Sequence, residues 1–102
     1  MPTRFAVSFS LKAEEDLEEI WSFIAADSPD NATKFILQLE KQVESLGRFP
    51  ARCPLIPENE LLRAKYRHLI YGDYRTVFRV SNKTVFVVRI ISSARLLDTS
   101  TI

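Results

Sequence analysis

Hydrophobic and polar residues alternate at the start of the chain. The hydrophobic positions are Phe5, Val7, Phe9 and Leu11, separated by alanine and serine. A period of two residues is typical of a strand with one buried face. We therefore expect a first strand here. Ser10 offers a side-chain oxygen as the N-cap of a helix that follows.

The pattern then changes to helical spacing for two segments. The first stripe is Leu17, Ile20, Trp21 and Ile24, with Glu14, Glu15, Glu18 and Glu19 on the solvent side. Ser28 and Pro29 form the start signal of a second helix, and Gly47 is expected as its C-cap. The second stripe is Ala32, Phe35, Ile36, Leu39, Val43 and Leu46. The link is short, which predicts an antiparallel helical hairpin with Trp21 in the core.

Residues 48–60 contain three prolines and no periodicity, which predicts a surface loop. Three candidate strands follow, Leu61–Tyr71, Tyr74–Ser81 and Thr84–Ser93, joined by two-residue turns at 72–73 and 82–83. The expected fold class is α+β: a small, antiparallel-rich sheet with an N-terminal strand, a two-helix hairpin packed on one face and a C-terminal three-stranded core. We expect one domain over residues 1–102.

Tight turns also predict which residues share a face of the sheet. One face would hold Arg67, Leu69, Tyr71, Tyr74, Thr76, Phe78, Val80, Val85, Val87, Arg89 and Ile91. The other would hold Tyr66, His68, Ile70, Arg75, Val77, Arg79, Phe86, Val88, Ile90 and Ser92. A slip of one residue would exchange the two sets.

Composition excludes several classes of protein. No apolar run is long enough to span a membrane, and the N-terminus lacks the hydrophobic region of a secretory signal, so we expect a cytoplasmic location. Cys53 is the only cysteine, which excludes an internal disulfide and a cysteine-based zinc site. With two glycines there is no glycine-rich phosphate loop. We expect neither a cofactor nor a metal.

The net charge of +1 conceals an asymmetry along the chain. Residues 1–60 carry six basic and eleven acidic side chains, a net charge of −5, whereas residues 61–102 carry eight basic and two acidic ones, a net charge of +6. A basic half indicates an acidic or polyanionic partner, and its six arginines suit carboxylate or phosphate groups. The alternative is that the two halves attract each other.

Several segments together resemble the RelE/ParE toxin superfamily. They are the helical segment "LKAEEDLEEIWSFIAADSP" at Leu11–Pro29, the five residues Asn31–Phe35, the motif "LGRFP" at Leu46–Pro50, and the run from Tyr66 to Arg95 that ends in "SSAR". The similarity covers roughly residues 5–96. It implies the toxin of a type II toxin–antitoxin pair, with a microbial-RNase-like fold and a cognate antitoxin that wraps it in a hetero-oligomeric complex. Operator DNA would be contacted only through the antitoxin.

The superfamily contains two activities. RelE-like toxins cut messenger RNA within the ribosome, and ParE-like toxins poison DNA gyrase. The positions that match the nuclease branch are Lys65, Arg67, Arg75 and Arg95. If the nuclease interpretation holds, these catalytic residues would bind phosphate and stabilise the charge that develops on it.

Two departures favour the gyrase interpretation. Ser92 stands where many members have histidine, and no tyrosine or histidine follows Arg95 as a general acid or base. The helical hairpin also resembles the ParE branch. The alternatives are a ribosome-dependent endoribonuclease and an inactive member that only binds its antitoxin and helps to regulate their operon.

Structural interpretations compete with each functional one. Arg75 and Arg95 could pair with acids from the helices, and Lys65 and Arg67 could belong, with Arg63, to a solvated row of charges. His68 is more typical of a hydrogen-bonded sheet residue than of a base, and Cys53 of an unreactive thiol. We further expect the antitoxin to dock on the sheet face that the helices leave free.

Overall fold

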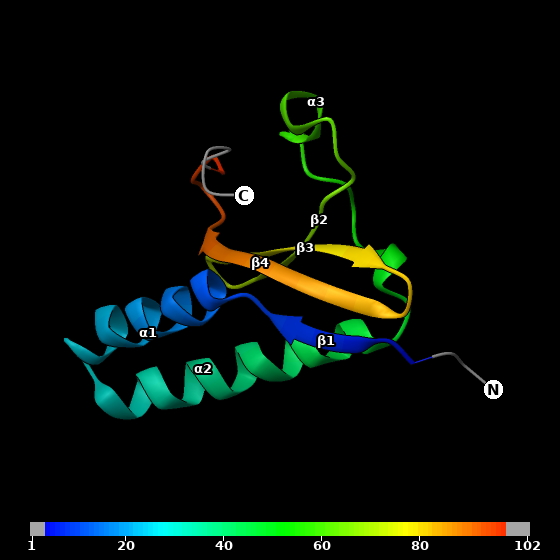
Figure 1. Cartoon of the computed structure of the whole chain (residues 1–102). Coiled ribbons are helices and arrows are strands. Elements are labelled where there is room, and N and C mark those ends of the chain that lie inside the picture. Colours follow the sequence, from blue (N-terminus) through cyan, green and yellow to red (C-terminus); the bar gives the residue numbers. More distant parts are fainter. Residues whose placement is uncertain (1–3, 98–102) are drawn as a thin grey trace.

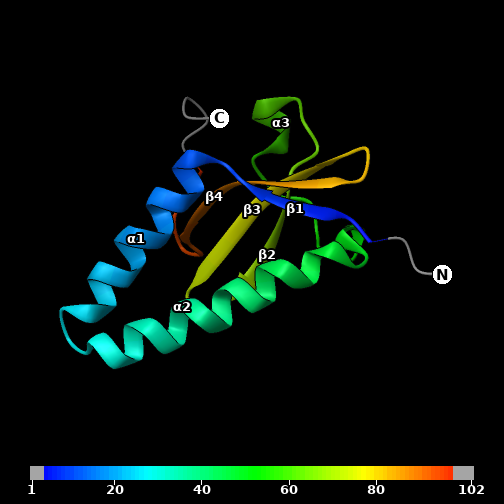
Figure 2. The same ribbon diagram turned by 60° about the horizontal axis from the view of Figure 1, so that its bottom comes forward.

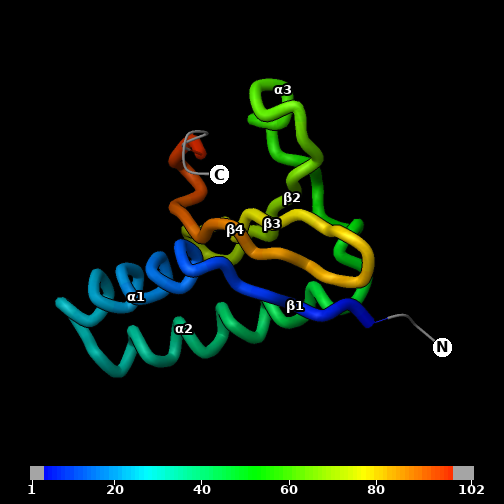
Figure 3. The backbone as a smooth tube through the Cα atoms, in the orientation of Figure 1, coloured from blue at the N-terminus to red at the C-terminus, as the bar shows by residue number. Residues whose placement is uncertain are grey.

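The computed structural model describes residues 4–97. Its elements are β1 (Ala6–Phe9), α1 (Leu11–Ala25), α2 (Pro29–Glu44), α3 (Asn59–Leu62), β2 (Arg67–Tyr71), β3 (Tyr74–Ser81) and β4 (Thr84–Ser92). The strand order is β1-β4-β3-β2, with β1 parallel to β4 and the other pairs antiparallel (Figures 1 and 3). The predicted α+β class, with its antiparallel-rich sheet and helical hairpin, is confirmed.

The helical hairpin covers one face of the sheet (Figure 2). Both predicted N-caps are present: Ser10 Oγ accepts a hydrogen bond from the Ala13 amide at 3.0 Å, and Ser28 Oγ accepts one from Asn31 at 3.3 Å. The main core lies between the two layers. Its fully or largely buried members include Ile20, Leu39, Val43, Phe78, Val85, Val87 and Ile90.

The placement of Trp21 in the core is wrong. Its side chain is 39% exposed, and its indole nitrogen donates to Thr33 Oγ1 at 3.3 Å. The buried positions of α1 are Ala13, Asp16 and Ile20, so the face that packs on the sheet is centred away from Trp21. The indole therefore lies on the margin of the hairpin, where it contacts α2 from outside.

Gly47 does not act as the C-cap of α2. The helix continues into a short 3-10 helix, Ser45–Gly47, and no glycine except Gly72 has a left-handed φ among the described residues. The Gly47 carbonyl accepts a hydrogen bond from Phe5 at 2.8 Å, and an added Cβ would lie 3.0 Å from the Phe5 carbonyl oxygen. Its small size thus allows the chain before β1 to cross the end of α2.

The segment expected to be a loop and the start of the next strand also differ from expectation. A 3-10 helix at Pro50–Arg52 and the helix α3 lie there, and β2 begins at Arg67 instead of Leu61. The Asn59 side chain donates to the Tyr66 carbonyl at 2.8 Å and accepts from the Tyr66 amide at 2.9 Å. These two hydrogen bonds bring Asn59 and Tyr66 together and turn the chain between them back on itself. Leu61, in this turn, is 81% exposed.

Both two-residue turns are confirmed, since Tyr71 pairs with Tyr74 and Ser81 with Thr84. The predicted assignment of residues to the two faces of the sheet is correct only up to a β-bulge in β4. Phe78 pairs with Val87 but Val77 with Arg89, so Val88 is an additional residue that reverses the alternation beyond it. The lists of face residues are therefore wrong at the end of β4. Arg89 and Ile91 share the face of Arg75, whereas Ile90 and Ser92 lie on the helix side.

A second, smaller core covers part of the sheet face away from the helices. It comprises Ile56, Val77, Ile91 and Leu97, with Leu62 and Tyr66 packed against it. The predicted free face is consequently smaller than expected. Within residues 4–97, no helix is long and apolar enough to cross a membrane.

Candidate functional site

Arg75 lies on β3, on the face away from the helices, and is almost completely buried. Its guanidinium forms a bidentate ion pair with the carboxylate of Glu58, the residue before α3. Nη1 donates to Oε1 at 3.2 Å and Nη2 donates to Oε2. The hydrogen bonds from Arg75 hold the pKa of Glu58 down to about 2. The charge of Arg75 is therefore neutralised inside the protein by an acid from the first half of the chain.

The same pair fastens the C-terminal segment to the sheet. Arg75 Nη2 donates to the Arg95 carbonyl oxygen at 2.9 Å, and Glu58 Oε2 accepts from the Leu97 amide at 2.8 Å. His68 Nδ1 lies 3.2 Å from Arg75 Nη1. Burial, and then the charge of Arg75, lowers the pKa of His68, so its neutral imidazole accepts this hydrogen bond. His68 thus has the structural contact expected of a sheet histidine.

The side chain of Arg95 points elsewhere and is exposed. It lines a hollow of 340 Å³ between α1 and the end of β4, together with Phe23, Tyr74 and Ser92. Phe23 is 76% exposed. Only the backbone of Arg95 participates in the Arg75–Glu58 contact, so its guanidinium is available at the surface.

Lys65 and Arg67 lie just before and at the start of β2, in an environment that differs from those of Arg75 and Arg95. Arg67 opposes Phe78, a residue of the main core, so its side chain starts from the helix-side face. Its Nη1 donates to the carbonyl oxygens of Cys53 and Ala51. Lys65 is exposed and lines the same hollow as Arg67. The structure therefore distributes the four predicted basic residues over three environments and does not gather them around one reacting group.

Cys53 is buried, and burial raises the pKa of its thiol. This environment is typical of an unreactive cysteine. The four glutamates of α1 at 14, 15, 18 and 19 are exposed, as expected of a solvated face. Among the described residues, no group of three or more histidine, cysteine, aspartate or glutamate side chains could hold a metal ion.

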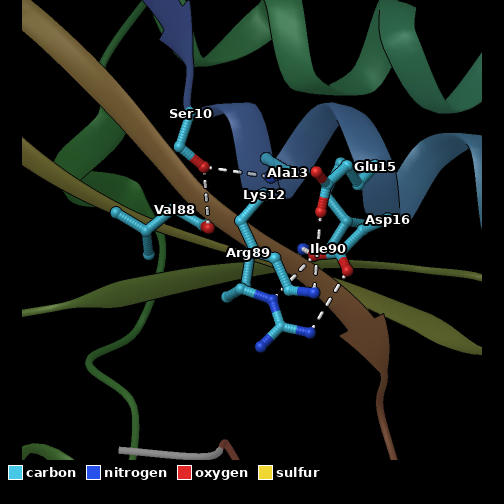
Figure 4. Close-up of polar contacts among 8 residues, drawn as sticks. All are labelled: Ser10, Lys12, Ala13, Glu15, Asp16, Val88, Arg89 and Ile90. Atoms are coloured by element: carbon cyan, nitrogen blue, oxygen red, sulfur yellow. Dashed lines mark hydrogen bonds and ion pairs between the residues drawn. The ribbon is translucent and has the colours of Figure 1, made fainter. Parts of the chain in front are cut away.

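Asp16 was missed by reasoning from the sequence. It is buried in α1 and accepts from Arg89 Nε at 2.8 Å and from the Ile90 amide at 2.9 Å (Figure 4). The contact lies beyond the end of β1, where the edge of β4 has no neighbouring strand. The Asp16 carboxylate accepts there in place of a strand carbonyl. One signal was available: Asp16 follows Ala13 by three residues and precedes Ile20 by four, on the buried stripe.

These two ion pairs explain part of the charge asymmetry. Asp16 and Glu58 come from the acidic half, and Arg89 and Arg75 from the basic half. Attraction between the halves therefore accounts for two of the eight basic residues. Of the remainder, Lys65, Arg79 and Arg95 are exposed and form no ion pair within residues 4–97.

Comparisons with known proteins agree with this fold. The chain is similar to a chain of the chromosomal ParDE TA system from P. aeruginosa, with 21% identity, a TM-score of 0.69, and 88% of this chain and 97% of that chain covered. It is also similar to a chain of the RelBE2 toxin–antitoxin complex from Mycobacterium tuberculosis, with 24% identity, a TM-score of 0.59, and coverage of 87% and 98%. No curated protein sequence matches.

A family match extends over nearly all of the chain. Residues 7–97 match the family described as "ParE toxin of type II toxin-antitoxin system, parDE". The matched range includes the helical hairpin, all three C-terminal strands and the segment that the Arg75–Glu58 pair holds. The chain therefore belongs to the ParE toxin family of type II toxin–antitoxin systems.

Proposed function

We propose that this toxin acts by binding and poisoning DNA gyrase, and that it does not cut RNA. The observation that carries the proposal is the burial of Arg75 against Glu58. A nuclease needs guanidinium groups free to stabilise charge on a phosphate as the 2′-hydroxyl attacks. Here the carboxylate already takes that charge, and an anion would have to displace it from a buried site.

The separation of the other candidates supports the same proposal. Lys65 and Arg67 share a hollow that does not include Arg95. His68 is a poor general acid at neutral pH, because its pKa is lowered and its Nδ1 faces the Arg75 guanidinium. Arginine stays protonated and is a poor proton shuttle, so the described site lacks the paired acid and base that RNA cleavage needs.

One observation favours the alternative, a ribosome-dependent endoribonuclease. Arg95 and Tyr74 line the same hollow, which would place one cation and one phenol together. Tyr74 also packs on Phe35, with ring centroids 5.6 Å apart, and this contact holds the phenol in the helix–sheet interface. This arrangement of Arg95 and Tyr74 supports the second candidate function, that of a ribosome-dependent endoribonuclease.

The partner that follows from membership of this family is an antitoxin, encoded by an adjacent or overlapping gene. It would neutralise the toxin and contact operator DNA on behalf of the complex. The exposed arginines and lysines of the second half suit an acidic segment of such a protein.

Induction of the toxin alone tests the proposal. We expect plasmid supercoiling to fall and DNA breaks to accumulate before translation slows, because gyrase is the first target. Arg95→Ala serves as a matched variant, since it removes the exposed guanidinium and keeps the backbone carbonyl that Arg75 binds. A fall in translation with codon-specific messenger cleavage that Arg95→Ala abolishes, and with supercoiling unchanged, would establish the nuclease instead.

A further inference from the structure

One corner of the helix-side face of the sheet is not covered by either long helix. A hollow of 360 Å³ lies there, lined by the apolar side chains of Phe5, Phe49, Pro50 and Val80 and by the cations Lys65 and Arg67. Figure 2 shows this end of the molecule, where the carboxyl end of α2 reaches the start of β1. This hollow shares no lining residue with the hollow between α1 and the end of β4, where Arg95 lies, and Arg75 does not line it.

The backbone of Phe49 at the rim of this hollow is strained. Its φ is +49° and its ψ is +58°, a left-handed conformation that bulky residues rarely adopt. The next residue is Pro50, which ordinarily directs the preceding residue toward an extended conformation. Arg52 holds the strained turn, because its amide and its Nη1 donate to the Phe49 carbonyl at 3.0 and 3.2 Å.

The strain is not explained by burial of the aromatic ring. Phe49 is 71% exposed, so its ring contributes little to the core. Strained backbone that the surrounding contacts enforce is concentrated at ligand clamps and other functional positions. Glycine would adopt this conformation without strain and would leave the rest of the turn in place. The ring of Phe49 is therefore exposed enough to contact another molecule.

The charge of the hollow indicates what that contact is. Lys65 has no ion pair within residues 4–97, and Arg67 donates only to backbone carbonyls, which carry no compensating charge. Two positive charges therefore lie beside the apolar side chains that line this hollow. An extended peptide that alternates a hydrophobic side chain with carboxylates matches both features.

We propose that this hollow binds an acidic, apolar segment of the antitoxin. One hydrophobic side chain of that segment would enter between Phe5, Phe49 and Val80, and its flanking carboxylates would meet Lys65 and Arg67. A hydrophobic side chain of a peptide can fill the apolar part of the hollow, whereas a nucleic-acid phosphate would be matched only by Lys65 and Arg67. The inference rests on the antitoxin partner and is independent of gyrase as the target.

The test uses the full-length toxin and the antitoxin encoded by the adjacent gene, with affinity measured by competition titration. Lys65→Glu and Phe49→Gly should each weaken binding at least tenfold, and the effect of Lys65→Glu should diminish in high salt. Lys41→Glu, the same charge change at an exposed site on α2, should alter binding less than twofold. Phe49→Gly should unfold at the same or a higher temperature than the wild type, which separates lost contact from lost fold.

A photo-reactive phenylalanine analogue at position 49 identifies the occupant directly. We expect cross-links to an antitoxin peptide with net negative charge and a hydrophobic residue. Antitoxin affinity unchanged in both variants, or cross-links to nucleic acid or to gyrase, would overturn the proposal. Gyrase inhibition by each free variant is measured in parallel, so a wild-type toxin without effect on gyrase would refute the proposed function and leave the antitoxin result readable.

Discussion

Arg75 and Glu58 form the contact with the largest consequences at the scale of single residues. The ion pair is buried, it is reinforced by the Leu97 amide and the Arg95 carbonyl, and each partner would be left charged and desolvated if the other were removed. Residues 17 apart in sequence thus hold together β3, the loop before α3 and the C-terminal segment.

We predict that Glu58→Gln lowers the free energy of unfolding by about 3–5 kcal/mol, the usual cost of breaking a buried pair from one side. Urea denaturation measures the change. Glu60→Gln is the matched control, because this neighbouring glutamate is exposed, and should change stability by no more than about 0.5 kcal/mol. Equal effects of the two substitutions would show that Glu58 is not paired in solution.

The same pair predicts how stability depends on pH. A glutamate in the unfolded chain titrates near its ordinary pKa of 4.5, whereas the folded pKa of Glu58 is about 2. The folded state therefore binds this proton less tightly, and the contribution of the pair is complete above pH 4.5 and declines as the pH falls toward 2. Denaturation midpoints measured between pH 6 and 3 should fall more steeply for the wild type than for Glu58→Gln. Parallel curves would contradict this assignment.

Ile20 and Trp21 are adjacent in α1 but have opposite environments. Ile20 is 6% exposed and lies in the main core, whereas Trp21 is 39% exposed. We predict that Ile20→Ala costs about 2–5 kcal/mol. Trp21→Ala should cost less than Ile20→Ala, despite the larger side chain that it removes. Thermal or urea unfolding of the two variants measures both losses in the free energy of unfolding. A larger loss for Trp21→Ala than for Ile20→Ala would mean that the indole is buried in solution.

At the scale of elements, α1 is attached to the sheet through a carboxylate as well as through hydrophobic packing. Asp16 accepts hydrogen bonds from the Arg89 side chain and the Ile90 amide at the edge of β4 that β1 leaves unpaired (Figure 4). We predict that Asp16→Ala accelerates hydrogen exchange of the Ile90 amide by at least about tenfold, because that N–H loses its acceptor. Exchange at Val77, in the interior of β3, should change less. An unchanged Ile90 amide would refute the contact.

Features that depend on neighbouring residues, such as helix caps and turns, could be predicted from the sequence. Features that depend on contacts between distant segments, such as a bulge or a buried ion pair, could not. The serine caps at 10 and 28 and the turns at 72–73 and 82–83 depend on neighbouring residues, and all four are present. The bulge at Val88 depends on how β4 meets both β3 and α1, so the alternation of the sequence gave no sign of it. Arg75 stays a predicted site residue. The structure adds that its partner is Glu58, which lies in a segment without periodicity and which the sequence did not indicate.

At the scale of the molecule, the acidic and basic halves of the chain are joined by two buried ion pairs and still leave exposed cations on the second half. Arg95 lines the hollow between α1 and the end of β4, whereas Lys65 and Arg67 line the hollow beside Phe49. Arg79 lies in neither hollow, and its guanidinium covers the ring of Phe86. Under the proposed function the toxin binds both a target and an antitoxin, and the two hollows would offer a separate surface for each. The antitoxin surface expected on the free sheet face stays a prediction, and the second small core reduces the area available for it.

Under the proposed function, the purified toxin acts on gyrase without cutting RNA. To test this, the toxin is incubated with gyrase, ATP and relaxed plasmid, beside a toeprinting reaction on translating ribosomes with the same preparation. We predict dose-dependent loss of supercoiling with accumulation of gyrase-linked DNA breaks, and no new messenger ends. Codon-specific messenger ends together with full gyrase activity would show that the toxin is a ribosome-dependent endoribonuclease instead.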